Sequence, residues 1–208
     1  MAASSLPSAA PFVVAITGAS GAVYAVRLLE VLLSSGRELH LMISPSGAAV
    51  IRQELDRAVS LEQFDARSLL PAAAAEQAAG LIRYHHYSDF MAPPASGSFL
   101  TGGMVVCPCS GSTLSGIAHG SSTNLIQRAA DVHLKERRKL ILVPRETPLS
   151  LIHLENMKLA AAAGAVILPA MPGWYHGVRS VQDLIDFVVA RILDQLGLPH
   201  ELMRRWGQ

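Results

Sequence analysis

Short runs of consecutive apolar residues alternate along the chain with longer segments in which apolar residues recur every three or four positions. The apolar runs predict strands at residues 12–17, 39–44, 104–108, 140–144 and 165–169. The periodic segments predict helices at residues 22–34, 46–57, 113–119, 125–135, 149–163 and 181–196. Strands that are apolar on both faces are typical of parallel sheets covered by helices. The alternation therefore predicts an α/β fold, with a doubly wound parallel sheet, helices on both faces and a single domain.

The composition is that of a folded protein without a strong charge bias. The chain has 208 residues, 50% of them hydrophobic, and a net charge of +1. This length suits one domain with its own core, and the balanced charge gives no indication of nucleic acid or an anionic membrane as a partner. The most apolar segment, residues 159–171, is broken by Gly164 and Pro169 and is shorter than the ~20 residues that a membrane-spanning helix needs.

Residues 1–11 are small and polar, and they lack the basic region that opens an export signal. We expect a flexible low-complexity tail here, followed by one domain over residues 12–208. Cys107 and Cys109 are separated by a single proline, which is too close for an ordinary structural disulfide. A soluble protein of the reducing cytoplasm is therefore expected.

One long segment has no charge at all. Residues 90–127 contain no Asp, Glu, Lys or Arg, although 16% of the chain is charged, and residues 128–146 are then rich in charge. An uncharged segment of this length, rich in Gly, Ser and Pro, is poorly suited to ordinary solvent exposure. Three interpretations remain open, because the segment could line a ligand site, be covered by another subunit or form a flexible loop.

Small and hydroxyl-bearing residues follow the first three predicted strands, where each strand turns into a helix. In a parallel sheet these turns meet at the carboxyl edge, where helix amino termini favour anions. The turns comprise Gly18, Ala19, Ser20 and Gly21, then Ser44, Pro45, Ser46 and Gly47, then Ser110, Gly111, Ser112 and Thr113. The pattern predicts a site for a phosphate-bearing cofactor, although neither a standard dinucleotide fingerprint nor a Walker A sequence is present.

Two other kinds of site lack support in the sequence. Zinc needs about four ligands, and Cys107 and Cys109 have no second half-site. His85 and His86 are adjacent in a segment of strand character, so their side chains should point to opposite sides. No Gly-x-Ser-x-Gly sequence marks a serine hydrolase. We therefore expect no metal site and regard both cysteines as buried apolar groups.

Basic residues are a further candidate feature. Arg128 and Lys135 are seven residues apart, which places them on one face of a predicted helix, about two turns apart. From this spacing, a solvated basic face and an anion-binding site both remain open. Arg145 differs, because it is expected at the carboxyl end of a strand beside Glu146, and Arg191 lies on the last predicted helix.

Several segments resemble, in the same order, those of the UbiX-type flavin prenyltransferases. They are residues 17–21 (TGASG), 107–110 (CPCS), 125–135 (LIQRAADVHLK), 143–148 (VPRETP), 154–157 (LENM) and 169–175 (PAMPGWY). The resemblance covers about residues 12–208, and the PRE-x-P and HLENM segments are its most specific parts.

The resemblance implies a Rossmann-like flavoprotein that binds FMN and dimethylallyl phosphate. It also implies transfer of the prenyl group to N5 and C6 of the flavin, with release of phosphate and without a metal ion. The product, prenylated FMN, is the cofactor of UbiD-type decarboxylases. Members of the family typically assemble as homo-dodecamers with active sites at subunit junctions, which would account for the uncharged segment.

Residue roles follow from the same resemblance. The expected cofactor-binding residues are Gly18, Ala19, Ser20, Ser44, Ser110, Gly111, Ser112, Thr113 and Arg145. The expected catalytic residues are Ser20, Glu54, Lys135, Glu146 and Tyr175, with Ser20 near flavin N5 and relaying a proton with Glu54. Dimethylallyl phosphate is expected to be bound by Arg128, Lys135, Arg145, Glu146, Tyr175, Arg191 and Trp206.

Two alternatives remain. The first is an FMN-dependent cysteine decarboxylase of related fold, which would need a catalytic His and a Cys on a mobile lid. The second is a non-catalytic flavin-binding accessory subunit of a decarboxylase. The joint presence of Lys135, Arg145, Glu146 and Tyr175 favours catalysis, because binding FMN alone requires no second phosphate site.

Overall fold

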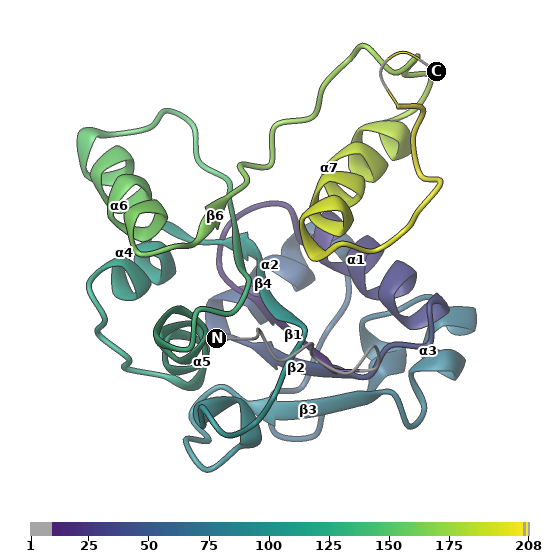
Figure 1. Cartoon of the computed structure of the whole chain (residues 1–208). Coiled ribbons are helices and arrows are strands. Elements are labelled where there is room, and N and C mark those ends of the chain that lie inside the picture. The colour runs from purple at the N-terminus through teal and green to yellow at the C-terminus, as the bar shows by residue number, and fades with distance from the viewer. Residues whose placement is uncertain (1–9, 206, 208) are drawn as a thin grey trace, which may run out of the picture.

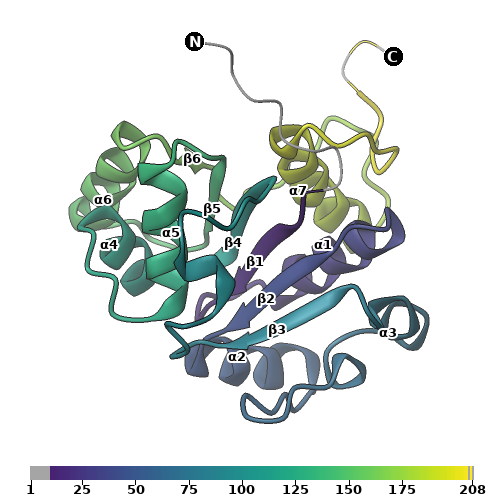
Figure 2. The same cartoon turned by 60° about the horizontal axis from the view of Figure 1, so that its bottom comes forward.

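A parallel sheet runs through the part of the chain that this computed structural model describes, residues 10–205 and 207. Its strands follow the order β3-β2-β1-β4-β5-β6 (Figure 1; β5 is labelled in Figure 2). Their bounds are β1 Phe12–Ile16, β2 Leu39–Ile43, β3 Ile82–His86, β4 Gly103–Cys109, β5 Leu140–Pro144 and β6 Val166–Ile167. The predicted doubly wound, Rossmann-like architecture is confirmed, because every pairing is parallel and the strand order reverses between β1 and β4.

Helices cover both faces of the sheet (Figure 2). One face packs against α1 Ala22–Ser34, α2 Pro45–Leu55, α3 Ala72–Ala78 and α7 Val181–Leu196. The other face packs against α4 Gly111–Ala118, α5 Leu125–Lys135 and α6 Leu151–Ala162. Two short 3-10 turns, η1 Ala66–Ser68 and η2 Pro93–Ala95, lie in the connections. Among the described residues, no helix combines the length and apolar character needed to cross a membrane.

The inner strands explain the sequence pattern, since every residue of β1, β2, β4 and β5 is buried. The prediction of a fully buried strand over residues 165–169 was wrong. Only Val166 and Ile167 form β6, which lies at the sheet edge and is half-buried. An edge strand has one neighbour, so one side of its backbone and part of its side chains stay outside the core.

The remaining differences concern element ends and two elements that were not predicted in full. β4 begins at Gly103, α4 begins at Gly111 rather than at residue 113, and α6 begins at Leu151 rather than at residue 149. The strand character around His85 is confirmed as β3, whereas α3 was not predicted. β3 is difficult to recognise because it is an edge strand with the polar sequence IRYHH.

The first described residues are part of the fold. Ala10 is buried, and the Pro11 carbonyl accepts a hydrogen bond of 2.9 Å from the Gly102 backbone N–H. The flexible tail expected for residues 1–11 otherwise lies outside the described residues, and so does Trp206. The predicted boundary at residue 12 therefore stays a prediction.

Candidate functional site at the carboxyl edge of the sheet

Thr17 ties together the ends of β1 and β4, where the strand order reverses. Its hydroxyl donates to the Pro108 carbonyl at 2.8 Å and accepts from the Ser110 backbone N–H at 2.8 Å. The Thr17 backbone N–H also donates to the Pro108 carbonyl at 3.2 Å. These bonds place the turns after β1 and β4 side by side at the crevice where parallel α/β sheets bind ligands.

The turn after β1 is packed too closely for larger residues. A Cβ on Gly18 would lie 2.4 Å from Cβ of Ser46, and Gly21 has a φ of 116° that disfavours other residues. Ala19 is buried and Ser20 is half-buried. The first two predicted turns therefore pack against each other, with glycine at the point of closest approach.

Glu54 supplies the cap that helix α1 lacks. The residue before α1, Gly21, has no side chain to offer, and the Glu54 carboxylate accepts hydrogen bonds from the backbone N–H groups of Gly21 at 2.9 Å and Ala22 at 2.8 Å. Partial burial tends to raise the pKa of Glu54. Hydrogen bonds from Ser20, Gly21 and Ala22 and the positive charge of Arg145 outweigh burial and lower the pKa overall. Glu54 is therefore an anion at neutral pH, next to Ser20.

The second turn begins helix α2. The Ser44 hydroxyl accepts from the Gly47 backbone N–H at 3.0 Å, so Ser44 caps the helix. Pro45 occupies the first position of the helix, where its missing N–H costs nothing. A Cβ on Gly47 would lie 2.6 Å from the Ile16 carbonyl oxygen, which explains glycine at this position.

The third turn begins helix α4 with a cluster of hydroxyl groups. Ser110 caps the helix by accepting from the Thr113 backbone N–H at 3.3 Å. Its hydroxyl also lies 3.0 Å from Oγ1 of Thr113 and 3.2 Å from Oγ of Ser112. Gly111 lies against His153 of α6, whose Nε2 would be 3.2 Å from an added Cβ. Sequence reasoning did not identify His153.

Arg145 provides a positive charge at the same edge, directly after β5. It is half-buried, and its Nε atom is buried without a hydrogen-bond partner. Its charge acts to lower the pKa of both Glu54 and Tyr24, although burial keeps the pKa of Tyr24 above its ordinary value. A buried guanidinium N–H without a partner, at the edge of the sheet where α1, α2 and α4 also begin, fits an anionic group such as the phosphate of FMN.

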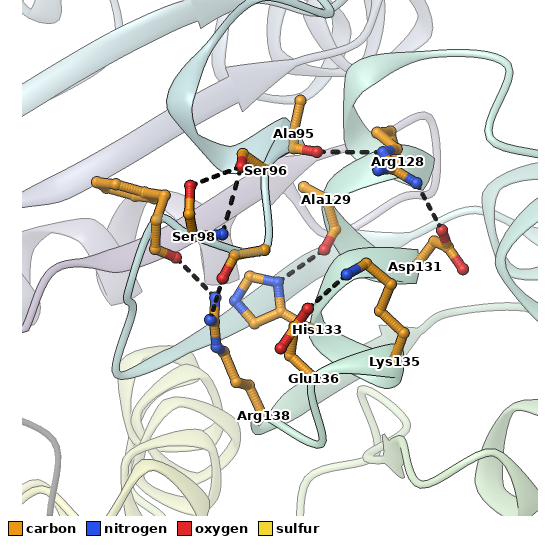
Figure 3. A network of polar contacts seen from close by, with 12 residues as sticks. Ala95, Ser96, Ser98, Arg128, Ala129, Asp131, His133, Lys135, Glu136 and Arg138 are labelled. Carbon is orange, nitrogen blue, oxygen red and sulfur yellow. Dashed lines mark hydrogen bonds and ion pairs between the residues drawn. The ribbon is translucent and has the colours of Figure 1, made fainter. Parts of the chain in front are cut away.

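The residues expected to bind the prenyl donor are not gathered in the same way. Glu146 is exposed next to Arg145. Lys135 is the last residue of α5, five residues before β5 begins, so it lies towards the amino edge of the sheet, away from Arg145. Lys135 forms an ion pair with Glu136 (Figure 3).

Arg128 lies on α5 about two turns before Lys135, as the spacing predicted. Its guanidinium donates to the Asp131 carboxylate at 3.0 Å and to the Ala95 carbonyl at 3.1 Å (Figure 3).

Arg191, on α7, is 2.7 Å from the Asp194 carboxylate. It also lines a pocket of about 260 Å³ between β6 and α7, whose walls are mainly apolar.

Tyr175 lies in the connection between β6 and α7. Its ring packs edge-on against Phe187, with 5.7 Å between ring centroids. Among the described residues, the side chains expected at the donor site thus come from the segment after β5, from α5, from α7 and from this connection. The described part of one chain does not bring Lys135 to the carboxyl edge, where Arg145 lies.

Like His153, Thr17 and Tyr24 lie at this edge and were given no role by sequence reasoning. A buried Thr at the end of an apolar strand does not stand out in the sequence as a site residue, because its role is to form hydrogen bonds to another strand and its following turn. Tyr24 gives no motif, but its ring would be 2.9 Å from a Cβ on Gly21, and it lies close enough to Arg145 for their charges to interact. Only the folded chain brings these groups together.

The cysteines are buried, as predicted. Both are free thiols within β4, and burial raises the pKa of Cys109 to about 12 and that of Cys107 still further. Such thiols are not ionised at neutral pH and are poor nucleophiles and metal ligands. Among the described residues, no group of three or more His, Cys, Asp or Glu side chains is placed to hold a metal ion.

Comparisons with known proteins agree with this geometry. Residues 3–193 match the Flavoprotein family model. The chain is 53% identical to the flavin prenyltransferase UbiX of Pseudomonas aeruginosa, over 93% of this chain and 92% of the relative. It is 46% identical to the flavin prenyltransferase UbiX of Methanocaldococcus jannaschii, over 94% of this chain and 97% of the relative.

Solved structures show the same similarity. AnUbiX (PadA1) in complex with FMN and dimethylallyl pyrophosphate has a TM-score of 0.83 and 41% identity, over 96% of this chain and 98% of that one. A dodecameric FMN-dependent UbiX-like decarboxylase from Escherichia coli O157:H7 has a TM-score of 0.83 and 43% identity, over 95% of this chain and 100% of that one. Several cysteine decarboxylases share the fold at 16% identity or less. The identities, the coverage and the shared architecture confirm the resemblance, and the chain belongs to the UbiX family of flavin prenyltransferases.

Proposed function

We propose that this protein transfers the dimethylallyl group of a dimethylallyl phosphate ester to reduced FMN. The group is joined to flavin N5 and C6, phosphate is released, and the product serves a UbiD-type decarboxylase. Family membership supports prenyl transfer as the activity. FMN and dimethylallyl pyrophosphate in a relative with 41% identity support the two substrate classes.

One observation of this structure carries the proposal. The buried, unpartnered Nε of Arg145 lies at the edge where the Ser20 and Glu54 pair adjoins the start of α1. A cation with a free donor suits a phosphate group, and an ionised carboxylate beside a hydroxyl suits the movement of a proton. Binding FMN alone would require the first feature and not the second.

The residues present fit FMN. The turns after β1, β2 and β4 are assigned to the flavin, with Arg145 next to its phosphate. When bound, reduced flavin would supply the nucleophilic nitrogen and carbon atoms. Ser20 would hold a proton at its Oγ and exchange it with the Glu54 carboxylate, whose hydrogen bonds from α1 keep it ionised and in place.

The donor residues are assigned to binding and charge stabilisation. Arg128, Lys135, Arg145 and Arg191 would offset the negative charge of the departing phosphate, and Tyr175 would donate a hydrogen bond to it. Glu146 would orient these cations. Trp206, which lies outside the described residues, would offer an aromatic face to the allylic cation.

The separation of Lys135 from Arg145 supports a site shared between copies of the chain. The outer face of α6 is apolar and exposed, with 80% of Leu151 and 72% of Ile152 accessible. Phe90 and Met91, at the start of the uncharged segment, are also exposed. Contact between copies would cover these surfaces and bring Lys135 of one copy to the carboxyl edge of another. We propose a homo-dodecamer, the assembly reported for the E. coli relative.

Two further assignments belong to the same proposal. We place the protein in the cytoplasm, where its two free thiols would remain reduced. The cysteine decarboxylase alternative is disfavoured, because both cysteines are buried in a central strand and neither lies on a lid. The flavin-carrier alternative remains the main competitor.

The decisive experiment is anaerobic incubation of the protein with reduced FMN and dimethylallyl phosphate, followed by mass spectrometry of the extracted flavin. We expect the flavin to gain one C5H8 unit, and a parallel incubation with the diphosphate identifies the preferred donor. A protein that binds FMN and leaves its mass unchanged with both donors would instead be a flavin carrier.

A further inference from the structure

The segment that precedes β4 is held in place by side chains of α5 and of the turn after it. We call residues 95–101 the clasp loop; it belongs to the uncharged segment. Arg128 donates to the Ala95 carbonyl at 3.1 Å, and Arg138 donates to the carbonyls of Gly97 and Phe99, the latter at 2.6 Å (Figure 3). Guanidinium groups from α5 and the following turn thus donate hydrogen bonds to the backbone carbonyls of a loop that has no charged side chain of its own.

A buried hydrogen bond anchors the end of the loop. Thr101 and His133 are each 1% exposed, and Thr101 Oγ1 lies 2.8 Å from His133 Nε2. The other ring nitrogen of His133 lies 2.7 Å from the Ala129 carbonyl (Figure 3). A carbonyl can only accept, so Nδ1 carries the hydrogen. Burial lowers the pKa of His133 to about 4, the ring is neutral, and the Thr101 hydroxyl must therefore donate to Nε2.

The clasp loop also touches the Lys135 and Glu136 ion pair. A Cβ built on Gly97 would lie 2.8 Å from Nζ of Lys135 and closer still to Oε1 of Glu136. The backbone at Gly97 therefore contacts the ammonium group and limits where it can lie. The backbone at Gly97 is in turn held by the hydrogen bonds from Arg138 and by the buried Thr101–His133 bond four residues further along.

We propose that Thr101 and His133 are positioning residues for Lys135. By anchoring the clasp loop on α5, they fix Gly97 against the ion pair and so set where the ammonium group meets the phosphate of the donor. This role rests on the proposed function, in which Lys135 binds the donor. None of these groups lies at the turns assigned to FMN, so the role concerns the donor alone.

The test compares Thr101→Val, which keeps the shape but removes the donating hydroxyl, with Thr101→Ser, which keeps the hydroxyl. We expect Thr101→Val to raise KM for dimethylallyl phosphate by about tenfold, a loss of about 1.4 kcal/mol of donor binding, with FMN affinity unchanged. Thr101→Ser should restore KM. A lower melting temperature of Thr101→Val with an unchanged KM would show a purely structural bond and overturn the proposal.

Gly97→Ala provides a second route that does not disturb the core. The added methyl group meets only the tips of two flexible side chains, so the melting temperature should hold while the donor KM rises. Ser98→Ala, in the same loop, serves as the matched control. Its exposed hydroxyl bonds to the Ser96 hydroxyl at 2.8 Å within the loop itself and holds no part of α5, so the variant should change neither value. An unchanged KM in Gly97→Ala would overturn the proposal.

Lys135→Ala separates this inference from the proposed function. If its KM for the donor equals that of the wild type, Lys135 does not bind the donor and the positioning role is wrong, even if prenyl transfer itself is observed. If the wild-type protein shows no prenyl transfer, the proposed function fails instead.

Discussion

The carboxyl edge of the sheet and the far end of α5 hold their charged groups in different ways. At the carboxyl edge, Glu54 is bound by backbone N–H groups of its own chain, while Arg145 keeps a buried Nε without a partner. At the end of α5, Lys135 is half exposed and paired with its sequence neighbour Glu136. The first region leaves a buried hydrogen-bond donor without a partner, which suits a ligand bound within one chain. The second holds a half-exposed cation on its sequence neighbour, as our proposal expects of a group that completes a site on another copy.

The largest expected effect concerns the donor region. Tyr175→Phe keeps the aromatic ring that packs against Phe187 and removes only the hydroxyl. Prenyl transfer should fall by ~10²–10³, the usual effect of losing one donor to a developing negative charge, while FMN affinity stays unchanged. Single-turnover rates with saturating donor measure the change. Wild-type rates in this variant would remove Tyr175 from the chemistry.

Arg145→Ala tests the carboxyl edge. The flavin phosphate would lose a charged partner worth ~1.5–3 kcal/mol, so FMN affinity should fall by about one to two orders of magnitude. Quenching of flavin fluorescence on titration measures the affinity. Arg191→Ala is the control, because Arg191 lies on α7 and pairs with Asp194. Full FMN affinity in Arg145→Ala would place the flavin elsewhere.

Lys135→Ala should impair binding of the donor and leave binding of FMN intact, and so distinguish the two regions. Since Lys135 lies away from the flavin turns, FMN affinity should equal that of the wild type. KM for the donor should rise by about tenfold, as for a lost charged hydrogen bond. Steady-state rates over a range of donor concentrations give this value. Weakened FMN binding would show that the two regions are not separate.

The smallest expected effect is on stability. Glu54→Gln removes a charged cap from α1 and should lower the free energy of unfolding at pH 7 by ~0.5–2 kcal/mol. The folded protein lowers the pKa of Glu54 from 4.5, so this contribution is complete above that value and is lost as pH falls through the lower folded pKa. Urea unfolding at pH 7 and pH 3 should show a difference between wild type and variant that shrinks in acid. An equal difference at both pH values would contradict the charged cap.

The fold could be predicted from the sequence for segments that are buried on all sides. The central strands β1, β2, β4 and β5 are buried on both faces, so their sequences are apolar throughout and the parallel sheet follows. Of the edge strands, β3 was recognised only around His85 and His86, and β6 was predicted too long and fully buried, because half of the surroundings of an edge strand lie outside the core. Side-chain polarity then no longer follows strand periodicity.

The site residues likewise differ in how far the sequence alone could place them. The flavin turns follow strands directly, so sequence order alone places Ser20, Ser44 and Ser110 at one edge. The Ser20 and Glu54 contact came from the family resemblance. Thr17 and Tyr24 were missed, because their contacts join segments distant in sequence. The separation of Lys135 from Arg145 could not be predicted from their spacing, since it depends on the direction in which α5 crosses the sheet.

The central claim is that one copy supplies Arg145 and another supplies Lys135 to each complete site. Mixed oligomers of Arg145→Ala and Lys135→Ala chains, made by co-expression in equal amounts, test it most directly. The assay uses FMN and donor concentrations well below saturation, where each variant alone should reach about a tenth of the wild-type rate or less. If sites form between copies, the mixed oligomers should rise to about a quarter of the wild-type rate, because half of the sites draw a native Arg145 and half of those a native Lys135. Mixed oligomers no more active than the variants alone would place both residues in the same chain's site and contradict the account.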